Sequence, residues 1–94
     1  MDTVKNLEKI FKGLANRRRL AIIKFLSQKR EATVADIAER IRLSFKATSK
    51  HLAILRQIDI IDSRQQGLNV YYRMADALPS VVENVLKRIS NSYE

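Results

Sequence analysis

The chain of 94 residues contains no cysteine, and it has only one proline and two glycines. Without cysteine it can form no disulfide, no thiolate metal site and no thiol redox sensor. The scarcity of proline and glycine, together with many good helix formers, predicts a mostly α-helical protein. No apolar run is long enough to span a bilayer, and the N-terminus lacks a signal-peptide pattern, so a cytoplasmic protein is expected.

Basic residues outnumber acidic ones by 18 to 10, which gives a formal net charge of +8 and a pI of about 10.2. The chain is long enough for only one domain, which we place at residues 1–94. So large an excess of positive charge on one small domain indicates an anionic partner. Nucleic acid is the first expectation, and an acidic protein or a membrane surface is the second.

Apolar residues recur at helical spacing in five segments, and two strands follow the fourth of these. Gly13 is expected to interrupt the first helix, Asn16 to cap the second, and Thr33 to open a capping box for the third. The turn between Ile41 and Ser44 is so short that the third and fourth helices indicate a helix-turn-helix. The expected fold is mostly α with a β-hairpin wing, a winged helix-turn-helix. Its parts are terminal helices at 1–13 and 77–94, the helix-turn-helix at 34–57 and the wing at 60–74.

The helix expected at about 45–57 has an outer face without acidic groups. On a helical wheel, the inner side gathers Ala47, His51, Ile54, Leu55 and Ile58, with Thr48 and Leu52 at its edge. The outer side gathers Phe45, Lys46, Ser49, Lys50, Ala53, Arg56 and Gln57. A solvated helix face usually mixes charges of both signs, because Glu–Lys pairs four residues apart add stability.

A cationic face of this kind suits a helix that lies in the major groove of DNA. Small side chains let the backbone approach, and lysine and serine can donate hydrogen bonds to phosphates or base edges. The free N–H groups of the first helical turn also attract an anion. The simpler interpretation is an ordinary solvated surface. The tight turn before this helix favours DNA, and so does the hairpin after it, which carries Arg64, Gln65, Gln66 and Asn69.

Four successive segments, LANRRRLAIIKFL, EATVADIAERIRLS, SKHLAILRQIDII and NVYYRM, resemble the ArsR (arsenical-resistance repressor) family of winged-helix regulators over about residues 7–74. The MarR and PadR families are the most easily confused with it. The resemblance makes the fourth helix the recognition helix and the hairpin the wing. It implies DNA contacts from Lys46, Thr48, Ser49 and Lys50 in the helix. We add Arg56, from the same outer face, and expect Arg64, Gln65 and Asn69 of the wing to contact the DNA backbone. The resemblance leaves open whether Arg19 is structural or faces a phosphate.

Metal-sensing members of that family carry E-L-C-V-C-D-L on the third helix, where this chain has EATVADI at residues 31–37. Thr33 and Ala35 fill the two cysteine positions, and a thiophilic metal needs those thiolates. Residues 76–94 contain no histidine, so the family's second metal site, on the C-terminal helix, is missing as well. We therefore expect no metal and no cofactor, while a small-molecule effector stays open. Asp59 stands where the family commonly has glycine, and aspartate tolerates a left-handed turn better than most residues.

The single histidine, His51, falls on the apolar side of its helix. We expect it to be packed and hydrogen-bonded rather than to contact DNA or a metal. Arg17 and Arg18 are interpreted as solvated, with a phosphate clamp as the alternative. Tyr72 is interpreted as the tyrosine that packs inward from its strand. No catalytic residues are predicted, because no glycine-rich phosphate loop, paired carboxylates or positioned catalytic base is recognisable.

Both ends of the chain carry apolar stripes that the core of so small a protein cannot bury completely. They consist of Val4, Leu7 and Phe11 at one end, and of Val82, Val85, Leu86 and Ile89, continued by Tyr93, at the other. We expect the surplus to be buried against a second copy, as the resemblance also implies. A two-fold dimer would set two recognition helices about one DNA turn apart, which implies a palindromic operator.

The sequence thus predicts a homodimeric, sequence-specific regulator that binds double-stranded DNA, by resemblance a repressor, without metal sensing, enzymatic activity or a membrane partner. Two alternatives stay open. One is a weakly specific DNA-organising protein held by its charge alone. The other is a winged-helix protein-interaction module, such as an antitoxin or an anti-polymerase factor.

Overall fold

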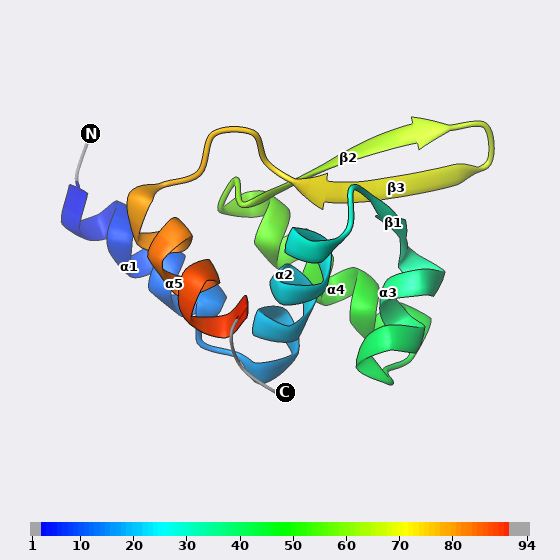
Figure 1. The fold of residues 1–94 in the computed structure, drawn as a ribbon, viewed down its shortest axis with the longest axis horizontal. Helices are drawn as coiled ribbons and strands as arrows, with labels where there is room; N and C mark the ends of the chain where they lie inside the picture. Colours follow the sequence, from blue (N-terminus) through cyan, green and yellow to red (C-terminus); the bar gives the residue numbers. More distant parts are fainter. Residues whose placement is uncertain (1–2, 91–94) are drawn as a thin grey trace.

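A computed structural model describes residues 3–90. The helices are α1 (Thr3–Leu14), α2 (Arg17–Gln28), α3 (Val34–Ile41), α4 (Phe45–Gln57) and α5 (Ser80–Ser90). The strands are β1 (Ala32–Thr33), β2 (Ile61–Gln66) and β3 (Asn69–Met74). In Figure 1 the hairpin of β2 and β3 extends to one side of a helical body, and α1 lies at the opposite side. The fold is a winged helix-turn-helix, as predicted.

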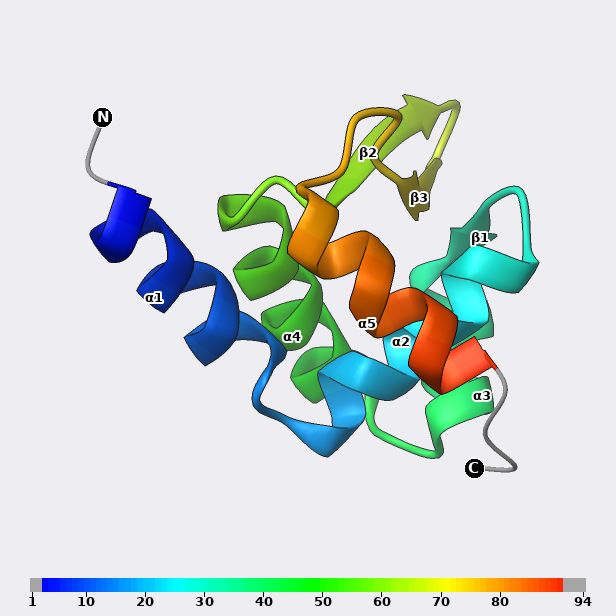
Figure 2. The ribbon, with the colours of Figure 1, turned by 60° about the vertical axis from the view of Figure 1, so that its left-hand side comes forward.

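The core lies around α2, which packs against α3, α4, α5 and β3. Ile22, Ile23 and Leu26 of α2 are almost fully buried there, together with Leu52 and Leu55 of α4. Each side chain of this kind stabilises the fold by roughly 1.5–3 kcal/mol relative to an exposed position. Figure 2 shows α2 behind α5 and beside α4, so α4 rests on the central helix of the body.

Thr33 caps α3 through the predicted capping box. Its Oγ1 accepts a hydrogen bond from the backbone N–H of Asp36 (3.2 Å), and Asp36 Oδ2 accepts one from the backbone N–H of Thr33 (3.2 Å). Two of the otherwise unpaired N–H groups at the start of α3 are satisfied in this way. The structure confirms this part of the sequence interpretation.

The hairpin does not stand alone, because β1 adds a third strand that the sequence pattern did not predict. The strand order is β1-β3-β2, all antiparallel, with Ala32 opposite Tyr72 and Thr33 opposite Tyr71. Two residues are too few to show an alternating pattern, so periodicity could not find this strand. Tyr72 packs against the core, as predicted.

Two turns depend on left-handed backbone. Gly67 has φ +63° at the first central position of the hairpin turn, the geometry of a type II′ turn, in which glycine is favoured. Asp59 has φ +59° and follows Ile58, the C-cap of α4. The next N–H, of Ile60, donates to the carbonyl of Leu55 (3.2 Å). Aspartate accordingly supplies the left-handed turn that ends α4, as predicted.

Gly13 does not interrupt α1, which continues through it to Leu14. The reason for glycine here is close packing. A Cβ added at Gly13 would lie 2.4 Å from Cδ1 of Ile58. The missing side chain lets α1 approach the end of α4, and this corrects the expectation of a helix break.

Candidate nucleic-acid interface

The start of α4 offers unpaired backbone donors. Ser44 caps the helix: its Oγ accepts from the backbone N–H of Ala47 (3.1 Å), and its carbonyl accepts from that of Thr48 (3.0 Å). Within residues 3–90, the N–H groups of Phe45 and Lys46 have no acceptor. The first turn contains no acidic residue, so the positive end of the helix dipole is uncompensated and can receive an anion.

The outer face of α4 is exposed and cationic. Lys46, Lys50 and Arg56 are exposed, and Ser49 between them is half-buried. The helix contains neither aspartate nor glutamate. None of its three cations pairs with a carboxylate among the residues that the structure describes. The charge on this face therefore remains available to an external anion.

Thr48 does not lie on this face. Its side chain is 0% exposed, and its hydroxyl has no hydrogen-bond partner. Thr48 is four residues before Leu52 and seven before Leu55, so all three point into the core from one side of α4. The expectation of a DNA contact from Thr48 is corrected accordingly: the helical wheel had placed it at the edge of the apolar side, and it belongs fully to that side.

Arg18 fixes the corner between α3 and α4, a role that the sequence interpretation missed. Its Nη1 donates to the carbonyls of Ile41 (2.5 Å) and Arg42 (3.2 Å). Arg42 itself is left-handed, with φ 56°, and ends α3. Arg18 therefore satisfies carbonyls at the C-terminus of α3 and ties the helix-turn-helix to α2. Arg17 is exposed, as expected.

Arg19 of α2 forms hydrogen bonds with both α1 and α4. Its guanidinium donates to the backbone carbonyl of Gly13, to that of Lys12 (3.3 Å), and to Nδ1 of His51 (3.1 Å). Burial lowers the pKa of His51 below 6.5, and the positive charges of Arg19 and Arg18 lower it further. His51 is therefore packed and hydrogen-bonded, as predicted. Arg19, whose role the sequence left open, makes structural contacts to α1 and α4 in the folded chain.

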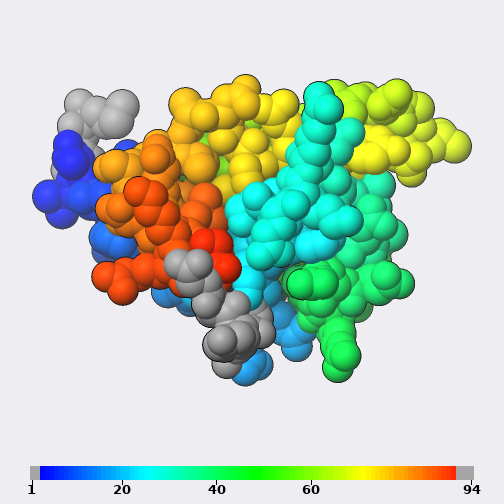
Figure 3. Space-filling view, viewed as in Figure 1, coloured from blue at the N-terminus to red at the C-terminus, as the bar shows by residue number. Residues whose placement is uncertain are grey.

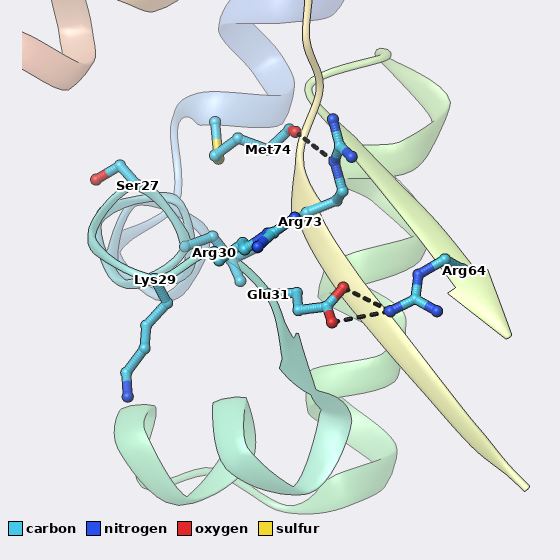
Figure 4. A pocket seen from close by; sticks show the side chains of 8 residues that line it. Ser27, Lys29, Arg30, Glu31, Arg64, Arg73 and Met74 are labelled. Carbon is cyan, nitrogen blue, oxygen red and sulfur yellow. Dashed lines mark hydrogen bonds and ion pairs between the residues drawn. The ribbon is translucent and has the colours of Figure 1, made fainter. Parts of the chain in front are cut away.

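The wing carries a pre-formed ion pair. Nη2 of Arg64 donates to both carboxylate oxygens of Glu31, at 2.8 and 2.9 Å, as Figure 4 shows. Arg64 also donates to Oε1 of Gln66 (2.6 Å) and lies 5.4 Å from the ring centroid of Tyr71. Its charge is thus already partly compensated within the chain. Such partly exposed pairs stabilise a fold by only about 0–1 kcal/mol, so a phosphate could take the place of Glu31.

The tip of the wing projects from the molecule. In Figure 3 the hairpin extends past the helical body. Gln65 and Asn69 are exposed near the tip, and Leu68 is 101% exposed. The wing residues expected to meet DNA are therefore accessible, although Arg64 is engaged with Glu31.

The apolar stripe of α1 is open to solvent. Val4, Leu7 and Phe11 are 78, 36 and 51% exposed and line a shallow apolar hollow together with Ala15. The stripe of α5 differs, because Val82 is 0% exposed and belongs to the chain's own core. Val82 is therefore removed from the expected dimer contacts. The other residues expected on α5, which are Val85, Leu86 and Ile89, are half-buried. Tyr93 lies outside the described residues.

Residues 3–90 contain neither a cluster of metal ligands nor a membrane-spanning helix. No three histidine, cysteine, aspartate or glutamate side chains come together there as a metal site would require. No helix in that range has the length and apolar character needed to cross a membrane.

Comparison with known proteins gives a consistent set of relatives. Residues 16–63, half of the chain, match the model of the "Bacterial regulatory protein, arsR family". The chain is 34% identical over 77 residues to the arsenical resistance operon repressor of Escherichia coli K12, which covers 82% of this chain and 66% of that protein, slightly less than two thirds. It is 31% identical over 80 residues to the transcriptional activator HlyU of Vibrio cholerae, covering 85% of this chain and 73% of HlyU.

The fold is similar to solved structures of the same kind. HlyU from Vibrio cholerae superposes with a TM-score of 0.81 at 28% identity, over 99% of this chain and 98% of that one. A homodimeric winged helix-turn-helix DNA-binding domain from Mycobacterium bovis, a possible ArsR-family transcriptional regulator, gives 0.77 at 28% identity, over 92 and 76% of the two chains. These matches are to regulatory proteins and not to enzymes.

Proposed function

The chain belongs to the arsR family of bacterial regulatory proteins, and we propose from this membership that it is a DNA-binding repressor. It binds double-stranded DNA sequence-specifically, as a homodimer on a palindromic operator. The observation that carries the proposal is the outer face of α4, where Lys46, Lys50 and Arg56 are exposed without any carboxylate. A recognition helix of this kind lies in the major groove, with its N-terminal residues toward the base edges.

Each side chain has a role that follows from its position. Lys46, Ser49 and Lys50, in the first half of α4, donate to base edges and to nearby phosphates. Arg56 is two turns further along the helix and neutralises a phosphate. On the wing, Gln65 and Asn69 donate to the backbone of the adjacent groove, and Arg64 joins them by exchanging Glu31 for a phosphate.

The dimer is proposed to form through the terminal helices. Leu7 and Phe11 of α1 remain exposed in the single chain, and Val85, Leu86 and Ile89 of α5 are only half-buried. Burying this surface against a second copy removes apolar area from water. Two-fold symmetry then presents two α4 helices to two half-sites.

Repression is proposed in preference to activation, although the relatives include proteins named for each. A dimer that occupies an operator excludes polymerase by binding alone. Activation needs an additional contact with the polymerase, and no residue of this chain is assigned to one.

The regulator is also proposed not to sense a metal through α3, because Thr33 is engaged in the capping box and Ala35 has no ligand atom. A small-molecule effector remains compatible with this function.

The deciding experiment is selection of bound sequences from a random duplex pool, followed by titration of the selected and random duplexes at physiological salt. A palindromic consensus bound at least about 10³-fold more tightly than random DNA supports the proposal. Equal affinity for both pools favours the weakly specific DNA-organising protein. Failure to bind any duplex at low salt favours the protein-interaction module.

Calorimetry with zinc, cadmium and arsenite tests the proposal that the protein does not sense a metal. A stoichiometric signal with submicromolar affinity overturns that proposal.

A further inference from the structure

Phe45 is a large apolar side chain held in solvent at the first position of α4, where it is 62% exposed. Its ring makes no aromatic or cation–π contact within residues 3–90, and the helix cap beside it is provided by Ser44. Phe45 lies one helical turn before Ser49, so the two side chains are neighbours on the outer face. The described fold therefore has no visible use for an aromatic ring here.

A single exposed apolar residue is ordinary on a protein surface, so exposure alone carries little. The position of Phe45 is what distinguishes it. The N-terminal residues of a recognition helix are those that approach the base edges. In α4 these are Phe45, Lys46 and Ser49, and Phe45 is the only one of the three whose side chain can neither donate nor accept a hydrogen bond.

The major groove offers one apolar feature that varies with sequence, which is the C5 methyl group of thymine. Every other base-specific group in that groove is a hydrogen-bond donor or acceptor, and a phenyl ring cannot distinguish among them. Because contacts of a ring with amino groups are weak, the base-specific partner that suits an aromatic ring best is this methyl group.

We propose that Phe45 is a specificity-determining residue that packs against the C5 methyl group of a thymine in each operator half-site. The inference rests on the proposed function, because it requires α4 to enter the major groove. It adds a readout by apolar contact to the hydrogen bonds assigned to Lys46 and Ser49. Burial of the ring and the methyl group against each other also removes from water the apolar surface that Phe45 exposes in the free chain.

The test is to exchange the thymines of the selected duplex, one position at a time, for deoxyuridine, which removes only the methyl group. Exchange of the single contacted thymine of one half-site is expected to weaken binding by the wild-type protein about fourfold, the effect of one buried methyl group. The Phe45→Ala variant is expected to bind the thymine duplex more weakly and to show no response to that exchange. Leu68→Ala, which removes another exposed apolar side chain, is the matched control and should keep the wild-type response.

The outcomes separate this inference from the proposed function. If no exchange affects the wild-type protein, or if Phe45→Ala weakens the thymine and deoxyuridine duplexes equally, the ring does not read a methyl group and the inference is overturned. Thermal unfolding of Phe45→Ala should match wild type, since the ring is exposed. If that variant does not fold, the deoxyuridine scan on wild type and Phe45→Gln decides the matter in the same way. Failure of wild type to bind the pool at all overturns the proposed function itself.

Discussion

Arg19 donates a hydrogen bond to Nδ1 of His51 over 3.1 Å, although the two residues are 32 positions apart in the chain. A guanidinium can only donate, so Nδ1 accepts and the proton of the neutral imidazole is on Nε2. The same arginine also binds the last turn of α1 through the carbonyls of Lys12 and Gly13. Arg19 of α2 thus links the end of α1 to α4, and its bond to α4 requires Nδ1 of His51 to be unprotonated.

The first prediction concerns pH. Burial and the charges of Arg19 and Arg18 depress the pKa of His51 in the folded chain below its ordinary value of 6.5. The unfolded chain therefore binds more protons than the folded one as the pH falls below about 6.5. The contribution of His51 to the free energy of unfolding is fully present above that pH and is lost as the pH falls through the folded pKa.

The measurement is urea unfolding of wild type and of His51→Asn across this range. Asparagine keeps an oxygen acceptor for Arg19 and does not titrate, and the carboxylate titrations common to both proteins cancel in the difference. Wild type should lose stability relative to the variant as the pH decreases. A difference that is constant with pH, or that has the opposite sign, would show that His51 is not held neutral.

Thr48 gives the second prediction. Its hydroxyl is fully buried without a partner, which costs free energy. Thr48→Val keeps the shape and removes that hydroxyl, so we expect unfolding to require about 1 kcal/mol more and the affinity for the selected duplex to stay unchanged. Ser49→Ala is the neighbouring control and should weaken DNA binding without a comparable change in stability. Loss of DNA affinity in a well-folded Thr48→Val protein would show that the hydroxyl of Thr48 contributes to DNA binding after all.

Lys50 gives the third prediction. If its ammonium group reads a base, Lys50→Ala weakens binding to the selected duplex by about 1–3 kcal/mol and affects random DNA much less. Fluorescence anisotropy at several salt concentrations distinguishes this from a phosphate contact, which would weaken all duplexes alike and reduce the salt slope by about 1. Lys29→Ala removes the same charge at the end of α2 and serves as the control. Equal effects of the two variants would argue against a specific role for Lys50.

The fourth prediction separates dimer contacts from the core. Phe11 is 51% exposed, so Phe11→Glu should fold normally and sediment as a monomer under conditions where wild type is a dimer. Val82 is 0% exposed, so Val82→Ala should instead lower the free energy of unfolding, by about 2 kcal/mol, and leave the assembly of the folded protein unchanged. A dimer that persists in Phe11→Glu would place the interface elsewhere.

The sequence predicted the helices and the hairpin well, because their signals are local. The cap at Thr33, the corner before Ser44 and the left-handed turn at Asp59 all depend on residues within one helical turn. Periodicity also identified the outer face of α4 correctly for Lys46 and Lys50.

Contacts between distant segments could not be predicted in the same way. Glycine is needed at position 13 because the side chain of Ile58, from the end of α4, packs directly against it. Arg64 forms an ion pair with Glu31, a residue 33 positions away. Arg18 looked solvated within a run of arginines, but it meets carbonyls that only the folded corner of α3 brings near. No local pattern encodes such partners, since they depend on how the helices pack.

Thr33 caps α3 with its side chain and pairs with Tyr71 of β3 through its backbone. The strand that supports the wing therefore runs directly into the helix-turn-helix, with no flexible spacer between them. The base of the hairpin is thereby connected to α3, the helix that leads into α4. If α4 enters the major groove as proposed, the base of the wing follows the orientation of the helix-turn-helix, so the register between the two sets of DNA contacts depends on the short pairing of β1 with β3.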